Sequence, residues 1–355
     1  MTVHPLPSGT IGELLILGFR GPRVPDWLRT FSQRFGLGGA ILFDFDWQTG
    51  TYERNIHSPA QVAELCAELA DLQSPPLVYV DQEGGRVRRL KEKLGFAPLP
   101  SAHDLAQMPR RNALELLRDS MDELARLGIH VNLAPVIDLN VNPDNPDIGR
   151  NLRSYSAEPR VVREMALLVN QAAREAGLGL CLKHFPGIGG ATVDSHEATM
   201  VLDGTLRDDQ LALFYELGRE VEGGAILVSH GIVPQWNSQL PACLAAEAVA
   251  RIREHLPDAL LISDDLQMQG MQRRFTTAQA LPKALSAGMD VLILGNNAIN
   301  QEDQSEVLAE ELEAAVRRDS ALAARVREAL GRVAARKARF IGLRQRFGRA
   351  GTGRG

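Results

Sequence analysis

Residues 158–185, EPRVVREMALLVNQAAREAGLGLCLKHF, contain a helical pattern followed by an apolar strand, and this unit decides the fold. From Glu158, apolar residues recur three and four positions apart as far as Gly177, a residue type that ends helices. The run from Leu178, LGLCLKHF, is apolar without alternation, which is typical of a strand covered on both faces of a parallel sheet. The stretch therefore predicts one helix–strand unit of an α/β fold.

Apolar runs of this kind occur eight times along the chain. They are ELLILGF from Glu13, GAILFDFD from Gly39, PLVYVD from Pro76, IHVNLAPVIDL from Ile129, LGLCLKHF from Leu178, GAILVSHGIV from Gly224, ALLISDD from Ala259 and MDVLILGN from Met289. Helical patterns lie between them, and the segment from Ser58, SPAQVAELCAELADL, begins with a capping Ser and a Pro at the first helical position. This alternation predicts a (β/α)₈ barrel. A doubly wound open sheet is less favoured, because no GxGxxG follows the first strand.

The chain after Asn297 shows two helical patterns, in residues 301–318 and 321–340, and no further strand. We therefore expect one barrel domain over residues 1–335, including these C-terminal helices, and a basic, flexible tail over residues 336–355. The tail is expected to be solvated, with an anionic partner as the less favoured alternative. Its basic residues are Arg336, Lys337, Arg339, Arg344, Arg346, Arg349 and Arg354.

Composition excludes several classes of protein. The 355 residues carry 39 Lys and Arg against 44 Asp and Glu, so the net charge of −5 provides no global attraction to nucleic acid or anionic lipid. Cys66, Cys181 and Cys243 are far apart and match no metal spacing, so we expect neither disulfides nor a zinc site. No basic leader or run of roughly 20 apolar residues is present. We expect a cytoplasmic protein without metal, cofactor, nucleic-acid partner or membrane partner; its oligomeric state is open, and a monomer is plausible.

Polar residues gather where the apolar runs end. The third run ends in VDQEGGRV, the fifth in KHFPG, the sixth in SHG and the seventh in SDDL. In a (β/α)₈ barrel the carboxyl ends of the strands meet at one face, where chemistry is placed. Charges after four separate runs therefore favour one converging site.

Single residues at these ends allow more than one interpretation. Asp81 can accept hydrogen bonds from a ligand hydroxyl or cap the next turn. Lys183 and His184 need a polar partner once buried, which a ligand or a barrel carboxylate would supply. His230 is either a site member or a structural histidine.

Two carboxylate motifs are also candidates. Asp194 can orient the imidazole of His196 for general acid/base work, although a lone D-x-H is a weak motif. Asp264 and Asp265 are adjacent at a strand end, so one faces the barrel mouth and the other the helix layer. Such a carboxylate could be a nucleophile, a base or a hydroxyl acceptor.

Three motifs in this order, VDQEGGRVRRL, KHFPGIG followed by VDSH, and ISDDLQM, resemble the bacterial β-N-acetylglucosaminidases of glycoside hydrolase family 3. The resemblance runs from about Gly39 to Asn297, nearly the whole barrel. It implies a single-domain (β/α)₈ enzyme that removes non-reducing terminal GlcNAc from muropeptides during cell-wall recycling in the cytoplasm.

The resemblance also assigns roles to residues. Asp264 matches the catalytic nucleophile, His196 the general acid/base and Asp194 its dyad partner. Other matching residues hold the sugar hydroxyls and the acetamido group or lie near the site. They are Asp81, Arg89, Arg153, Lys183, His184 and His230.

Two departures from the family pattern and several alternatives stay open. Ile188 stands where the family usually has a second His, and the segment from Asp147, DIGRNLRSY, is two residues longer than usual, so Arg150 competes with Arg153 for the sugar. Using His196 in place of a carboxylic acid would let phosphate compete with water, giving a GlcNAc phosphorylase. A β-glucosidase on the same fold is a further alternative, and so is a non-catalytic muropeptide-binding protein.

Overall fold

The computed structural model describes residues 9–52, 54–193, 200–221, 224–236 and 239–347. Eight parallel strands form one sheet in the order β11-β10-β9-β8-β5-β2-β1-β12. They are β1 (Leu15–Gly18), β2 (Gly39–Leu42), β5 (Leu77–Val80), β8 (Val131–Asn132), β9 (Gly179–Phe185), β10 (Ala225–Val228), β11 (Leu260–Ser263) and β12 (Leu292–Leu294). Each strand lies within one of the eight apolar runs.

The outer strands of this order also meet, which closes the sheet. Ile262 of β11 forms a parallel bridge with Val291, just before β12. The backbone N–H of Ser263 donates to the Val291 carbonyl over 2.9 Å. The predicted (β/α)₈ barrel is therefore confirmed.

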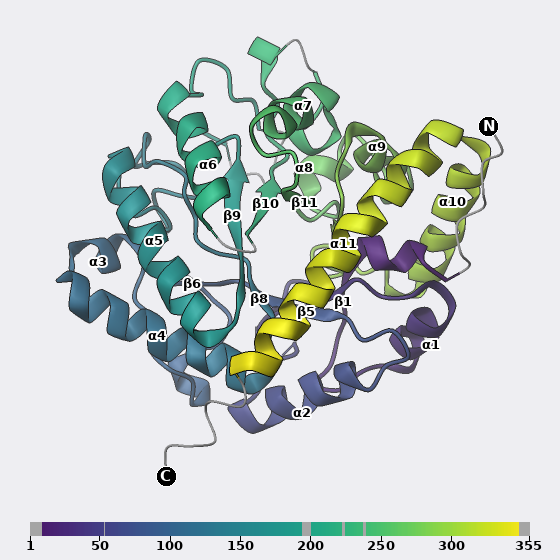
Figure 1. Ribbon diagram of the computed structural model, residues 1–355, viewed down its shortest axis with the longest axis horizontal. Helices are drawn as coiled ribbons and strands as arrows, with labels where there is room; N and C mark the ends of the chain where they lie inside the picture. The colour runs from purple at the N-terminus through teal and green to yellow at the C-terminus, as the bar shows by residue number, and fades with distance from the viewer. Residues whose placement is uncertain (1–8, 53, 194–199, 222–223, 237–238, 348–355) are drawn as a thin grey trace.

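Helices surround the barrel (Figure 1). They are α1 (Asp26–Phe35), α2 (Pro59–Ala70), α3 (Ala102–Gln107), α4 (Arg110–Leu127), α5 (Pro159–Ala176), α6 (Asp208–Glu220), α7 (Ala246–His255), α8 (Gln269–Gln272), α9 (Thr277–Ala287), α10 (Ser305–Arg318) and α11 (Ser320–Phe347). Two small hairpins, β3 (Phe45–Asp46) with β4 (Thr51–Tyr52) and β6 (Gln82–Gly84) with β7 (Val87–Arg88), extend from the ends of β2 and β5.

The helix boundaries follow the local sequence. At the start of α2, the Ser58 side chain accepts from the backbone N–H of Gln61 over 3.3 Å, and Pro59 needs no such partner. Helix α5 ends at Gly177, whose φ of 73° favours a residue without a Cβ. Both ends agree with the sequence prediction.

The barrel interior is filled by side chains from the strands. Tyr79 of β5 is buried against Gly39 of β2, where an added Cβ would lie 2.5 Å from the Tyr79 ring. Because the ring occupies this space, the closely packed interior requires a glycine at position 39.

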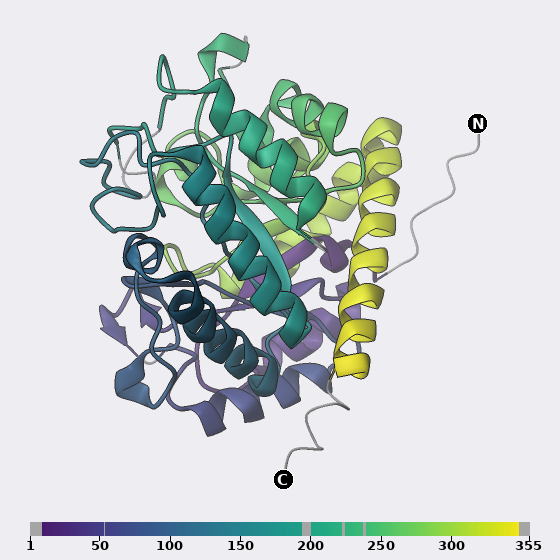
Figure 2. The same cartoon turned by 60° about the vertical axis from the view of Figure 1, so that its left-hand side comes forward.

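Helix α11 lies across the end of the barrel opposite to the loops that follow the strands (Figure 2). Phe340 is buried against Gly179 at the start of β9, and the Lys337 ammonium donates to the Leu37 carbonyl over 2.7 Å and to Glu13 over 2.6 Å. We expected a flexible tail from residue 336, yet the helix continues to Phe347. The physical reason is that Lys337 and Phe340 have partners on the barrel.

Within the described ranges, no helix is both long enough and apolar enough to cross a bilayer.

Candidate functional site

The mouth of the barrel, at the carboxyl ends of the strands, brings together residues far apart in the chain. Asp81 follows β5, Lys183 and His184 lie in β9, and Asp264 follows β11. Helix α11 lies across the opposite end of the barrel (Figure 2). The convergence predicted from the polar strand ends is what the barrel geometry produces.

A buried ion-pair network is the centre of this region. The Lys183 ammonium donates to Asp81 over 2.7 Å and lies 2.6 Å from Glu83, while Arg153 forms two hydrogen bonds of 2.8 Å with Glu83. Lys183 is only 2% exposed. A buried charge is tolerated only where it is paired, and here two cations alternate with two carboxylates. Of the two kinds of partner that the sequence allowed for Lys183, a ligand or a barrel carboxylate, the structure shows carboxylates.

These pairings hold the carboxylates ionised. Burial acts to raise the pKa of Asp81, but the charges of Lys183 and Arg89 outweigh it, so that pKa lies well below its ordinary value. For Glu83, burial is likewise outweighed by Arg153 and Lys183, which lowers its pKa to about 2. The mouth therefore presents fixed negative and positive charges at neutral pH.

His184 is held between two partners. Its Nδ1 lies 2.7 Å from Asp138 Oδ2, and its Nε2 lies 3.1 Å from Nη2 of Arg153. Because a guanidinium only donates, Nε2 accepts and Nδ1 carries the proton toward Asp138. Asp138 also accepts from the backbone N–H of Ile188 over 2.7 Å, which fixes the chain after β9.

Glu83 and Asp138 were missed as site residues in the sequence. Glu83 stands inside the VDQEGGRV motif, and Asp138 is the next-to-last residue of the fourth apolar run, much as Asp81 is the last residue of the third. The similar positions of Asp138 and Asp81 in their runs were the signal by which Asp138 could have been found. Asp44, which lies in the second run just after β2, is also part of the mouth: Arg89 lies 3.5 Å from Asp44 and 3.4 Å from Asp81.

The two adjacent aspartates after β11 differ in their surroundings. Asp264 is partly exposed, and its Oδ1 accepts from the backbone N–H of Asp265 over 2.9 Å. Asp265 instead turns toward β12 and accepts from the N–H groups of Gln267 at 3.0 Å and Gly295 at 3.1 Å. Both carboxylates are partly exposed, and Asp264, which accepts hydrogen bonds from fewer described residues, is the better placed of the two to meet a ligand.

His230, expected near the sugar, contacts protein through both ring nitrogens. Nε2 lies 2.8 Å from the Asp265 carbonyl and Nδ1 lies 3.3 Å from the Cys243 sulfur. A carbonyl only accepts, so Nε2 carries the proton and Nδ1 faces the thiol. This geometry suits a residue that holds the Asp264–Asp265 backbone better than one that binds a sugar directly.

Asp194 and His196 lie outside the described residues. The segment that leads to them is anchored: the Asn145 amide donates to the carbonyls of Ile188 over 2.7 Å and Ala191 over 2.9 Å. Asn145 is itself fully buried. The loop around residue 145 thus determines where the chain toward His196 departs from the barrel.

Comparison with known proteins identifies the family of the chain. Residues 17–335 match the family described as Glycosyl hydrolase family 3 N terminal domain. The chain belongs to glycosyl hydrolase family 3.

Relatives in this family are hexosaminidases. A beta-hexosaminidase of Thiobacillus denitrificans is 34% identical over 274 residues, covering 74% of this chain and 72% of the relative. Beta-hexosaminidase A of Pseudoalteromonas piscicida is 30% identical over 296 residues, covering 76% of this chain. The match takes in 48% of that relative, so it extends over about half of that longer protein.

Solved structures agree with the same family. A glycoside hydrolase family 3 β-N-acetylglucosaminidase from Paenibacillus sp. str. FPU-7 superposes with a TM-score of 0.81 at 30% identity. The superposition covers 93% of this chain and 62% of that one.

The two departures from the family 3 pattern have visible surroundings. Ile188 is buried, and its backbone rather than its side chain makes the polar contacts with Asp138 and Asn145. Of the two competing arginines, Arg153 lies in the ion-pair network and Arg150 is exposed. Arg153 is therefore the arginine of this segment that lies at the mouth.

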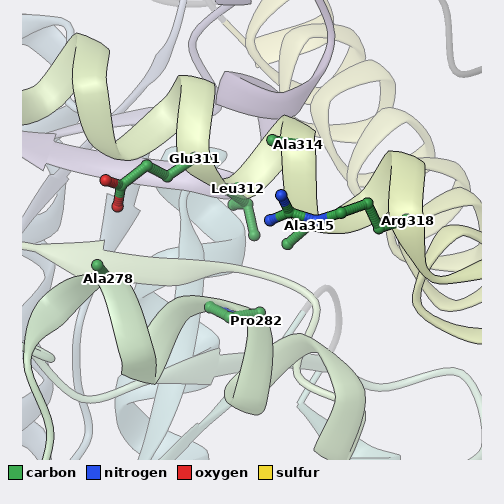
Figure 3. A pocket seen from close by; sticks show the side chains of 7 residues that line it. All are labelled: Ala278, Pro282, Glu311, Leu312, Ala314, Ala315 and Arg318. Carbon is green, nitrogen blue, oxygen red and sulfur yellow. The ribbon is translucent and has the colours of Figure 1, made fainter.

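A hollow of about 450 Å³ lies elsewhere on this family 3 barrel, between α9 and α10 (Figure 3). It is lined mainly by apolar residues, with Glu311 and Arg318 as the charged members of its lining. That lining lacks the alternating buried charges of the mouth. Across the described residues, no group of three or more His, Cys, Asp or Glu side chains is arranged to hold a metal ion.

Proposed function

We propose that the protein is a retaining exo-β-N-acetylglucosaminidase that removes non-reducing terminal GlcNAc from muropeptides or related β-GlcNAc glycosides. One observation carries the proposal: Asp264 is a partly exposed carboxylate at the same barrel mouth as the buried network around Lys183. A nucleophile beside fixed hydroxyl-binding charges is what glycoside cleavage with retention needs.

In the proposed reaction Asp264 attacks the anomeric carbon while His196, oriented by Asp194, protonates the leaving oxygen. The bond to the leaving group breaks as the bond to Asp264 forms, which gives a covalent glycosyl–Asp intermediate. His196 then removes a proton from water, which attacks the same carbon and releases Asp264. The two displacements together retain the anomeric configuration.

The sugar is proposed to meet the exposed edge of the network. Asp81 and Arg89 keep 14% and 25% of their side chains exposed, whereas Glu83 keeps 3%. Asp81 can accept from sugar hydroxyls, and Arg89, Arg153, Lys183 and His184 hold the polar groups around them. His230 acts on Asp264 through the backbone of Asp265.

The substrate class follows from the relatives. Their names specify hexosaminidases and a β-N-acetylglucosaminidase, and the motifs around Asp264 and Lys183 resemble those of the same group. We infer a role in peptidoglycan recycling in the cytoplasm from the resemblance of these motifs alone.

The deciding experiment compares hydrolysis of an aryl β-GlcNAc by the wild type and by Asp264→Asn, with Asp265→Asn as the matched control. We expect Asp264→Asn to lose at least about a thousandfold in kcat, because no covalent path remains. Asp265→Asn should lose much less, because an amide oxygen can still accept from Gly295. Near-normal activity of Asp264→Asn would disprove the nucleophile assignment.

Substrate and acceptor are tested in the same assay. An aryl β-glucoside replaces the GlcNAc glycoside in one arm, and inorganic phosphate is added in another. GlcNAc-1-phosphate as product would indicate a phosphorylase, and preference for the glucoside would indicate a β-glucosidase. Binding of GlcNAc without any turnover would indicate a non-catalytic binding protein.

A further inference from the structure

We propose that the end of the barrel opposite the mouth holds a phosphate-binding site, formed by Arg332 and Arg336 of α11 beside the buried Asp290. The ligand is a small molecule that carries a phosphate group, and its binding holds α11 on the barrel. Asp290 lies just before β12, at the end that α11 covers, whereas the proposed hydrolysis takes place at the carboxyl ends of the strands (Figure 2). The inference therefore does not depend on the proposed function.

One carboxylate at this end is shared by three arginines. Asp290 is fully buried, and it lies 2.7 Å from Nη2 of Arg253 and 2.6 Å from Nη2 of Arg325. Nε of Arg332 lies 3.4 Å from the same carboxylate. The backbone N–H of Leu261 also donates to it, over 3.0 Å. Both oxygens of Asp290 thus have close donors, and its single negative charge faces three positive ones.

Arg332 and Arg336 have donors that the protein does not use. Nε of Arg332 is buried and has no hydrogen-bond partner in the described part of the chain. Its second ion pair, with Glu328, is 3.7 Å long, and that glutamate side chain is 61% exposed. Arg336, one helical turn further on, is half-buried and forms neither a hydrogen bond nor an ion pair with a described residue. A guanidinium has five N–H donors, and leaving buried donors unpaired is costly.

The positive charges at this end also act on one another. Burial lowers the pKa of Arg336, and the charge of Arg339 lowers it further, against the effect of Asp290. Burial likewise lowers the pKa of Arg253, and Arg332 adds to the effect, again against Asp290. Like charges held together out of water cost free energy unless an anion balances them. The arrangement therefore favours a bound anion.

The excess positive charge matches that of a dianion. Arg339 and Asp258, whose charges also reach Arg336, offset each other. The remaining cluster has four cations and two carboxylates, which are Arg253, Arg325, Arg332, Arg336, Asp290 and Glu328.

Phosphate fits this cluster in both charge and geometry. A phosphate group carries about −1.5 to −2 charges at neutral pH, whereas a carboxylate ligand would bring one. Arg332 and Arg336 are four positions apart, so their side chains lie on the same face of α11. The planar guanidinium forms paired hydrogen bonds with phosphate oxygens, which a lysine cannot do. A bound phosphate would thus connect α11 with Arg253 of α7 and with the start of β12.

The test measures thermal unfolding of the full chain in potassium phosphate and, at matched ionic strength, in potassium chloride. Phosphate in large excess over its Kd should raise the Tm of the wild type by about 2–4 °C, because a ligand of the folded state stabilises it by mass action. Arg336→Gln should show less than half of this rise. In chloride, its Tm should equal or exceed that of the wild type, because a crowded cation has been removed.

Titration calorimetry measures the affinity directly. We expect a Kd on the order of 1 mM for so small an ion, and a loss of about tenfold or more in Arg332→Gln and in Arg336→Gln, since each removes charged hydrogen bonds. Arg327→Gln is the matched control, because Arg327 is an exposed arginine of the same helix. It should bind phosphate like the wild type.

Two further probes distinguish the sources of a phosphate group. Glucose 6-phosphate represents a soluble phosphomonoester, and vesicles of equimolar phosphatidic acid and phosphatidylcholine present phosphate as a lipid headgroup. Because both arginines are half-buried, we expect the soluble ester to bind and the vesicles not to sediment the protein through these residues. Sedimentation with vesicles that Arg336→Gln abolishes would overturn the small-molecule ligand in favour of a lipid.

The outcomes separate this site from the proposed function. No difference in wild-type Tm between phosphate and chloride, or an equal rise in the wild type and both variants, overturns the site. A lower Tm of Arg336→Gln in chloride, with unchanged phosphate affinity, overturns it as well, since the arginine would then serve the fold alone. All variants should hydrolyse an aryl β-GlcNAc like the wild type, and absence of that hydrolysis in the wild type bears on the proposed function alone.

Discussion

Glu83 shows how a single charged residue can be buried at the mouth and stay ionised. Lys183 and Arg153 both contact it, and together they lower its pKa to about 2 against the opposing effect of burial. A carboxylate whose pKa is lowered on folding stabilises the folded state at pH values above its unfolded pKa. That stabilisation is lost as the pH falls toward the folded pKa of about 2.

Replacing Glu83 with Gln should remove this pH dependence. We expect the urea-unfolding free energy of the wild type to fall between about pH 5 and pH 2, and that of Glu83→Gln to fall less steeply. At neutral pH the variant should be less stable by about 3 kcal/mol, because Lys183 and Arg153 lose a buried partner. Glu92→Gln, at an exposed glutamate, should follow the wild type. If the unfolding free energy of Glu83→Gln fell with pH as steeply as that of the wild type, Glu83 would not be a source of this pH dependence.

At the scale of elements, two loops after neighbouring strands are joined by the side chain of Asn145, together with that of Asn142, which also donates to the Ala191 carbonyl over 3.1 Å. Asn145 accepts from the N–H groups of Asp147 and Ile148 within its own loop, and it donates to Ile188 and Ala191 in the loop after β9. All four contacts are buried or nearly so. Asn145 is therefore a positioning residue for the chain that continues to His196.

Substituting Asn145 with Ala should lower kcat more than it weakens ligand binding. We expect kcat on an aryl β-GlcNAc to fall about tenfold if His196 is the acid/base as proposed, because the chain that leads to it loses its anchor at Ile188 and Ala191, while inhibition by free GlcNAc changes little. Asn151→Ala is the matched control, since Asn151 donates within the same loop, to Pro146 and Asp147, without reaching the second loop. Equal losses in the two variants, or a parallel loss of GlcNAc affinity, would contradict this role.

Helix α11 contributes to stability through its seat on the barrel. Phe340 is 4% exposed and fills the space above Gly179. Phe340→Ala should lower the unfolding free energy by about 3–5 kcal/mol, the cost of a large cavity. Thermal unfolding should show a fall in Tm, whereas Val307→Ala, at an exposed position of α10, should leave Tm nearly unchanged. A Tm of Phe340→Ala equal to that of the wild type would mean that the end of α11 contributes little to the stability of the fold.

At the scale of the whole molecule, charge is distributed unevenly. Between Ser320 and Gly355 there are nine arginines and Lys337 against Glu328 alone, although the whole chain has a net charge of −5. Positive charge is thus concentrated on the element that covers the closed end of the barrel.

This asymmetry should be visible in chromatography. At pH 7 and low salt we expect the protein to bind a cation exchanger despite its negative net charge, because the local field of a patch governs adsorption. The double variant Arg336→Gln, Arg339→Gln should elute at lower salt. Passage of the wild type through the column without retention would contradict the prediction.

The barrel was predictable from sequence because its strands are continuous apolar runs and its helices carry capping residues such as Ser58 and Gly177. Lys183 and Asp264 were predictable as site candidates because they end such runs. Glu83 and Asp138 were not, since their importance lies in holding Lys183, Arg153 and His184, which depends on contacts between distant strands. The full length of α11 could not be predicted for the same reason. The composition of its last part resembles a solvated tail, and the contacts of Lys337 and Phe340 with the barrel are visible only in the structure.

The position of α11 has a practical consequence for the handling of the protein. The helix crosses the end of the barrel away from the mouth (Figure 2). A linker that joins the chain after Phe347 to a solid support would therefore attach the molecule by the face opposite the mouth. Immobilised in this orientation, the enzyme would present its mouth to the bulk solution. Bulky glycan fragments could then reach it without passing the support.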